Sequence, residues 1–127
     1  MTPLLIDSWD TPGAVVVTVT GEIDTTNALR LQEYLIRAAR AGVPVVLDLA
    51  AMTFMDSKGL QALIHVHDEL RAVGGGLHLA AVQGTPARLL EITGVADFLN
   101  VHPSVDHALT ALDEPDAGDS FPERNPA

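Results

Sequence analysis

The sequence predicts an α/β fold in which helices pack against a mixed β-sheet of about four to five strands. Three observations lead to this prediction. Short runs rich in β-branched residues alternate with segments of helical periodicity, in the order β-β-α-β-α-β-α-β-α. One of these runs, VPVVLDL, is apolar on both faces, as expected of a central strand between two layers of helices. The length of 127 residues is typical of one domain.

The first elements are a predicted hairpin and a helix. Leu4–Trp9 and Ala14–Thr20 are rich in strand-forming residues, and the turn sequence Asp-Thr-Pro-Gly separates them. Thr25–Ala41 shows helical periodicity, and Asp24 or Thr25 would cap its start. Its apolar residues recur on one face, at Ala28, Leu31, Leu35 and Ala38.

The rest of the chain continues the alternation of strands and helices. The predicted elements are a strand over Val43–Leu49, a loop over Ala50–Met55, a helix over Ser57–Val73, a strand over Leu77–Val82, a helix over Thr85–Thr93, a strand over Phe98–Val101 and a helix over Ser104–Leu112. Because crossover connections are right-handed, the strands that begin at Val43, Leu77 and Phe98 should be roughly parallel. Residues 1–112 therefore form one predicted domain.

The pattern ends at residue 113. Residues 113–127, DEPDAGDSFPERNPA, are polar, acidic and rich in Pro, which predicts a disordered C-terminal tail.

The overall charge limits the classes of partner. Seven basic and seventeen acidic residues give a net charge of −10, which argues against binding to a nucleic-acid backbone and favours a partner with a basic surface. The chain has no cysteine, so no disulfide or zinc-thiolate site is expected. No signal peptide or apolar run of membrane-spanning length is present, so we expect a soluble, cytoplasmic protein without a membrane span.

The sequence allows more than one role for Ser57. It stands between Asp56 and Lys58 at the start of a predicted helix, where Asp56 or Ser57 could accept a backbone N–H as a cap worth ~1 kcal/mol. A nucleophilic serine would need a nearby base, but His65 and His67 lie about 12 to 15 Å further along the helix. The G-x-S-x-G motif of serine hydrolases is also absent. We therefore expect that the chain has no catalytic residue and is not an enzyme.

Gly59 lies in the first turn of the same predicted helix. Glycine costs up to ~1 kcal/mol relative to alanine there. Its presence, after the large apolar residues Phe54 and Met55, predicts that another molecule approaches the backbone closely.

The five histidines do not predict a metal site. A spacing of two on a helix points His65 and His67 to different sides, unlike an i, i+4 pair of ligands. His78, His102 and His107 are scattered along the sequence. A structural or surface role is therefore expected for all of them.

Two sequence motifs resemble those of a known protein family, and they occur in the same order as in that family. Val45–Leu63, VVLDLAAMTFMDSKGLQAL, resembles the core of the STAS domain family, and especially of the bacterial anti-sigma factor antagonists. Gly21–Asp24, GEID, is similar to the family's second motif. The spacing of the motifs and the order of elements fit as well, so the resemblance covers about residues 4–112. Lys58 departs from the pattern, because serine is most frequent there in the family.

The resemblance implies a protein-binding switch. Ser57 would be phosphorylated by an anti-sigma factor that is itself a serine kinase of the histidine-kinase-like ATPase type. The unphosphorylated antagonist would bind that factor and release a sigma factor; phosphorylation would break the complex, and a phosphoserine phosphatase would restore it. No cofactor is implied. The residues assigned to partner binding are Asp24, Asp56, Ser57, Lys58 and Gly59.

A second interpretation stays open. The chain could be a STAS module that acts as a regulatory or structural subunit, for instance in a lipid-transport or stress-signalling assembly, in which Ser57 is never modified. The free-standing length and the intact Asp-Ser acceptor favour the first interpretation. In either case we expect a monomer or weak dimer when the protein is free.

Overall fold

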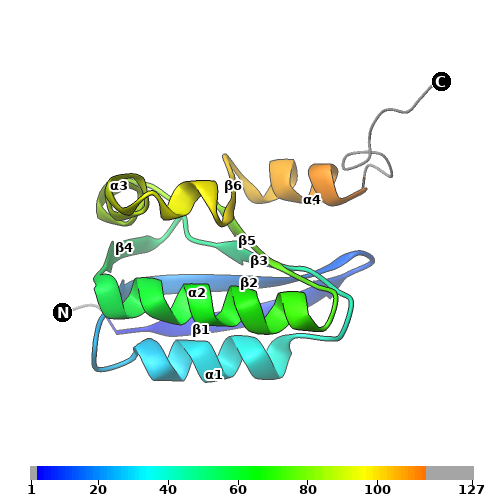
Figure 1. Ribbon diagram of the computed structural model, residues 1–127, viewed down its shortest axis with the longest axis horizontal. Helices are drawn as coiled ribbons and strands as arrows, with labels where there is room; N and C mark the ends of the chain where they lie inside the picture. Colours follow the sequence, from blue (N-terminus) through cyan, green and yellow to red (C-terminus); the bar gives the residue numbers. More distant parts are fainter. Residues whose placement is uncertain (1–2, 114–127) are drawn as a thin grey trace.

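A single mixed sheet with helices on both faces organises the computed structural model, which describes residues 3–113 (Figure 1). The elements in chain order are β1 (Leu5–Thr11), β2 (Ala14–Ile23), α1 (Ala28–Ala38), β3 (Val45–Asp48), β4 (Met52–Met55), α2 (Ser57–Ala72), β5 (Leu77–Ala80), α3 (Gly84–Thr93), the 3₁₀ turn η1 (Val95–Asp97), β6 (Asn100–His102) and α4 (Val105–Asp113). The predicted fold class is confirmed.

The long strand β2 links two sets of pairings. The main sheet has the order β1-β2-β3-β5-β6, in which β1 is antiparallel to β2 and the other neighbours are parallel. The pairing of β2 with β3 ends at Thr18, and from Gly21 onward β2 pairs in parallel with β4. Gly21 has a φ of 108°, a left-handed conformation that favours glycine. The carboxyl ends of β2 and β4 therefore lie side by side.

Two apolar layers hold the helices to the sheet. Helices α1 and α2 lie next to each other on one face, and α4 covers part of the other (Figure 1). Successive residues of β2 alternate between these layers, with Val15 and Val17 under α1 and α2 and Val16 in the cluster with Ala108 of α4. Each fully buried Leu or Val side chain contributes roughly 1.5 to 3 kcal/mol, so this packing holds the helices against the sheet.

The structure differs from the sequence-based elements in several places. The predicted loop over Ala50–Met55 contains β4, whose inner two residues are exposed while Met52 and Met55 are buried, so it lacks the alternation of a strand. Helix α1 begins at Ala28 rather than Thr25 because a separate turn precedes it. The last strand covers 100–102, because the Phe98 N–H bonds back to the Val95 carbonyl and extends the η1 turn.

The predicted disordered tail lies almost entirely outside the described residues. Asp113, expected to begin it, is instead the last residue of α4. Across residues 3–113, no helix combines the length and the apolar character needed to span a membrane.

Candidate functional site

The carboxyl ends of β2 and β4 meet the start of α2. The Asp56 N–H donates to the Ile23 carbonyl at 3.2 Å. Asp24 and Ser57 each follow one member of this bonded pair, so the two motifs found in the sequence join at one end of the sheet. All five residues predicted to bind a partner lie at this junction.

Asp56 is the cap of α2. Its backbone is extended, with φ −100° and ψ −173°, and its Oδ1 accepts the N–H groups of Lys58 and Gly59, both at 3.0 Å. Of the two caps considered from the sequence, Asp56 is therefore the correct one. Ser57 is the first helical residue and is exposed, and within residues 3–113 its hydroxyl makes no hydrogen bond. The hydroxyl is free to react or to contact another molecule.

Gly59 is a glycine for an internal reason. It is buried, and a Cβ atom there would lie 2.6 Å from Cγ2 of Ile23 and 2.7 Å from Cγ of Met55. The first turn of α2 thus packs directly on the ends of β2 and β4. The sequence-based explanation, close approach of another molecule, is not needed to account for this residue.

Asp24 is fixed in the turn before α1. Its carboxylate accepts from the hydroxyl and the N–H of Thr26, and these hydrogen bonds lower its pKa. Asn27 closes the turn: its Oδ1 accepts the Asp24 N–H and its Nδ2 donates to the Glu22 carbonyl, each at 2.9 Å. The expectation that Asp24 or Thr25 caps α1 was wrong, since Asn27 occupies the N-cap position. The result is an ionised carboxylate held beside the start of α2.

Exposed apolar side chains flank this junction. Phe54 of β4 is 39% exposed, and Leu29 of α1 is 61% exposed. A groove of about 530 Å³ between α1 and α2 begins at Lys58, the only lysine in the sequence, and runs past Leu29 to His65. Sequence patterns did not find this surface, because an apolar residue is more often buried.

The histidines have structural or surface roles, as predicted, but two of them that are far apart in the sequence form a pair. His67 is buried, and its Nδ1 accepts the Leu77 N–H at 3.1 Å; burial lowers its pKa. His78 and His102, scattered in the sequence, are in fact partners, with Nδ1 and Nε2 3.0 Å apart. Their strands are neighbours, and the pairing of Ala80 with His102 brings the rings together. Residues 3–113 contain no group of three or more side chains suited to hold a metal ion.

Comparisons with known proteins identify the family of this chain. The model of the STAS domain matches residues 6–108. The anti-sigma-F factor antagonist RsfA of Mycobacterium tuberculosis is 32% identical over 101 residues, which cover 77% of this chain and 79% of that protein. The anti-sigma-B factor antagonist of Bacillus subtilis is 29% identical over 96 residues, covering 76% and 88%.

A solved structure agrees as well. The crystal structure of an anti-sigma factor antagonist from Mycobacterium paratuberculosis superimposes with a TM-score of 0.79 at 28% identity, covering 88% of this chain and 96% of that one. The fold expected from the two sequence motifs is thereby confirmed. The chain belongs to the STAS domain family.

Proposed function

We propose that this protein is an anti-sigma factor antagonist whose unphosphorylated form binds an anti-sigma factor and so releases a sigma factor. The anti-sigma factor is a serine kinase that phosphorylates Ser57 and thereby ends the complex. One observation carries the proposal: the Ser57 hydroxyl is exposed and free of intramolecular bonds within residues 3–113, at the start of a helix capped by Asp56. The names of the relatives support the same role.

The chain supplies the acceptor and leaves catalysis to its partner. The Ser57 oxygen attacks the γ-phosphorus of ATP held by the kinase, the bond to ADP breaks so that ADP leaves, and a base of the kinase takes the hydroxyl proton. No general base from this chain bonds to the hydroxyl within residues 3–113, which fits a substrate rather than an enzyme. A phosphoserine phosphatase removes the group and restores binding.

A phosphate on Ser57 leaves the fold intact and changes the surface. The cap bonds of α2 run from Asp56 to the N–H groups of Lys58 and Gly59 and do not use the Ser57 hydroxyl. The helix N-terminus tolerates the added charge of about −1.5 to −2. That charge lies beside Asp56 and near Asp24, so it opposes a docked partner by repulsion and desolvation.

The docking surface is the junction together with its apolar border. Phe54 and Leu29 offer the area that a protein interface buries, and the acidic turn at Asp24 favours a basic partner surface. Lys58 belongs to this surface as an exposed residue of the first turn of α2, and Gly59 supports the turn from beneath by packing on Ile23 and Met55. We place the reaction in the cytoplasm and the free protein in a monomeric or weakly dimeric state.

The test uses the kinase-type anti-sigma factor of the source organism, titrated calorimetrically with this protein in the presence of ADP or ATP. Ser57→Ala should bind equally with either nucleotide, whereas Ser57→Asp should bind at least about tenfold more weakly. Thr110→Ala, an exposed hydroxyl on α4, is the matched control and should behave as the wild type. Equal binding by Ser57→Ala and Ser57→Asp would favour the second interpretation, a regulatory subunit in which Ser57 is never modified.

Intact mass spectrometry of the protein purified from its own host provides a second readout. The mass of one phosphate should appear on the wild type and vanish in Ser57→Ala. A phosphate that persists in Ser57→Ala would place the acceptor elsewhere.

A further inference from the structure

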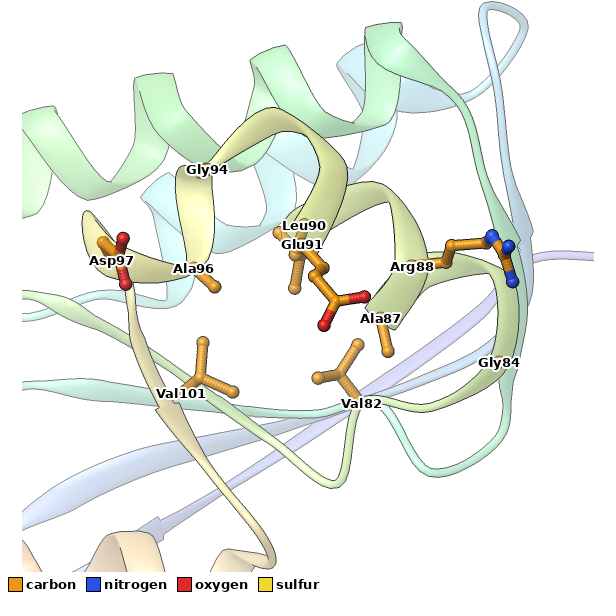
Figure 2. A pocket seen from close by; sticks show the side chains of 10 residues that line it. All are labelled: Val82, Gly84, Ala87, Arg88, Leu90, Glu91, Gly94, Ala96, Asp97 and Val101. Atoms are coloured by element: carbon orange, nitrogen blue, oxygen red, sulfur yellow. The ribbon is translucent and has the colours of Figure 1, made fainter.

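A second cavity lies away from the Ser57 junction. Its volume is about 640 Å³, and it opens between α3, the η1 turn and the last strand β6 (Figure 2). The apolar side chains that line it are Val82, Ala87, Leu90, Ala96 and Val101. It shares no lining residue with the groove between α1 and α2, so nothing in the proposed switch accounts for it.

The charged groups of this cavity are mostly acidic. Figure 2 shows the Glu91 carboxylate pointing from α3 into the cavity, while Arg88 points away from it and Asp97 lies at the far end on η1. Neither Glu91 nor Asp97 takes part in an ion pair within residues 3–113. The cavity thus combines an apolar wall with a carboxylate that has no cationic partner there.

The cavity borders an open edge of the sheet. Within residues 3–113, strand β6 ends the strand order and pairs only with β5. The His102 carbonyl accepts the Ala81 N–H at 3.1 Å, so it points toward β5. Neighbouring residues of a strand direct their N–H and C=O groups to opposite sides. The N–H and C=O groups of Val101 therefore point away from β5, to the open edge of the sheet. Val101 is 39% exposed, and its side chain lines the cavity.

We propose that this cavity is a docking site for an extended segment of a partner protein that adds to the edge of β6 and inserts an arginine or lysine side chain. The backbone of the segment bonds to the outward-facing N–H and C=O groups of Val101. The methylene stem of the basic side chain covers Val82 and Val101, and its charged head meets Glu91.

Charge selects this occupant over a second copy of the chain. The protein carries a net charge of −10, so two copies repel each other, whereas a basic segment is attracted. The acidic pair Glu91 and Asp97 adds a local preference of the same sign. The partner therefore differs from this chain and presents a basic residue within a strand-forming stretch.

Three blocked five-residue peptides test the proposal by titration into the ¹⁵N-labelled full chain. Thr-Val-Arg-Val-Thr should shift the amide signals of Val82, Glu91 and Val101 in a saturable manner. Replacing its arginine by glutamate should abolish saturation, and replacing both valines by proline should do the same, because proline restricts the backbone and cannot donate to an edge. Higher salt should weaken the first peptide's binding.

Two variants locate the charge contact. Glu91→Gln should bind the arginine peptide about two- to fivefold more weakly, as expected for an exposed ion pair. Glu33→Gln, an exposed acidic residue on α1, should bind it as the wild type does. Equal responses to the arginine and glutamate peptides would overturn the proposal. So would the absence of any response, or shifts confined to the groove between α1 and α2.

Discussion

The Nδ1 atom of His78 lies 3.0 Å from the Nε2 atom of His102, within hydrogen-bonding distance. The ring centres are 5.3 Å apart, so the two nitrogens lie between the rings and a single N–H can join them. A neutral pair satisfies this bond with one proton, whereas two protonated rings repel each other. Burial, followed by the charges of His102 and His67, lowers the pKa of His78 to about 4.

This pair should make the fold sensitive to acid. Between about pH 6.5 and about pH 4, the unfolded chain binds a proton at His78 that the folded chain excludes, so stability falls as the pH falls. The lowered pKa values of His67 and His102 act in the same direction. The contribution of His78 is at most about 2 to 3 kcal/mol and is fully present above about pH 6.5.

Urea denaturation at pH 7 and at about pH 4.5 measures this effect. His78→Gln removes the titrating group, so it should lose less stability on acidification than the wild type. His65→Gln changes an exposed histidine on α2 and should match the wild type at both values. An equal loss in wild type and His78→Gln would contradict the assignment.

Gly59 gives a prediction about packing. In Gly59→Ala, the new Cβ meets Ile23 and Met55 at distances no relaxed contact allows, so α2 must shift. We expect a loss of about 1 to 3 kcal/mol in the free energy of unfolding. Gly13→Ala is the control, since within residues 3–113 its Cβ would meet only Asp113 Oδ1, at an ordinary 3.6 Å. Similar stabilities of the two variants in thermal denaturation would contradict the packing argument.

Most of the fold was predictable because it rests on periodicity. The alternation of strand and helix patterns locates α1, α2, α3 and α4 and most strands to within a few residues. Strand β4 was not predictable, because its pairing with β2 depends on where β2 turns away from β3 at Gly21. Such pairing depends on the tertiary structure, so the four residues of β4 do not predict it.

The sequence named residues that the structure brings together at one junction, but it did not show why each residue is there. The two motifs pointed to Asp24, Asp56 and Ser57, and the Asp56 bond to Ile23 joins them. The sequence could not show that Gly59 serves internal packing, nor that His78 meets His102 across neighbouring strands. Both facts depend on distances between elements far apart in the chain.

Asp56 should link the stability of the fold to the proposed switch at Ser57. Asp56→Ala leaves the N–H groups of Lys58 and Gly59 without their acceptor and should cost about 0.5 to 2 kcal/mol of stability. Asp56→Asn keeps a side-chain acceptor at the same position and should retain most of it. If Ser57 is the acceptor, fraying of the first turn in Asp56→Ala should also slow its phosphorylation, measured by mass spectrometry against time. Unchanged stability in Asp56→Ala would contradict the role of the cap.

Lys58 should set the contrast in partner affinity between the two states of the proposed switch. Its ammonium group follows Ser57 directly and can offset part of the charge of a phosphate there. Lys58→Ser removes this cation, so the phosphorylated variant should repel the anti-sigma factor more strongly than the phosphorylated wild type. The ratio of dissociation constants, phosphorylated to unphosphorylated, should rise about two- to fivefold.

Arg37→Ser, which removes an exposed cation from the last turn of α1, is the matched control for net charge and should leave that ratio unchanged. Calorimetric titrations at low and high salt separate the electrostatic part, since the effect of Lys58→Ser should shrink as salt screens exposed charges. A ratio that falls in Lys58→Ser would mean that Lys58 contacts the partner directly and stabilises the unphosphorylated complex. The comparison therefore distinguishes a lysine that offsets the charge of the phosphate from one that contacts the partner directly.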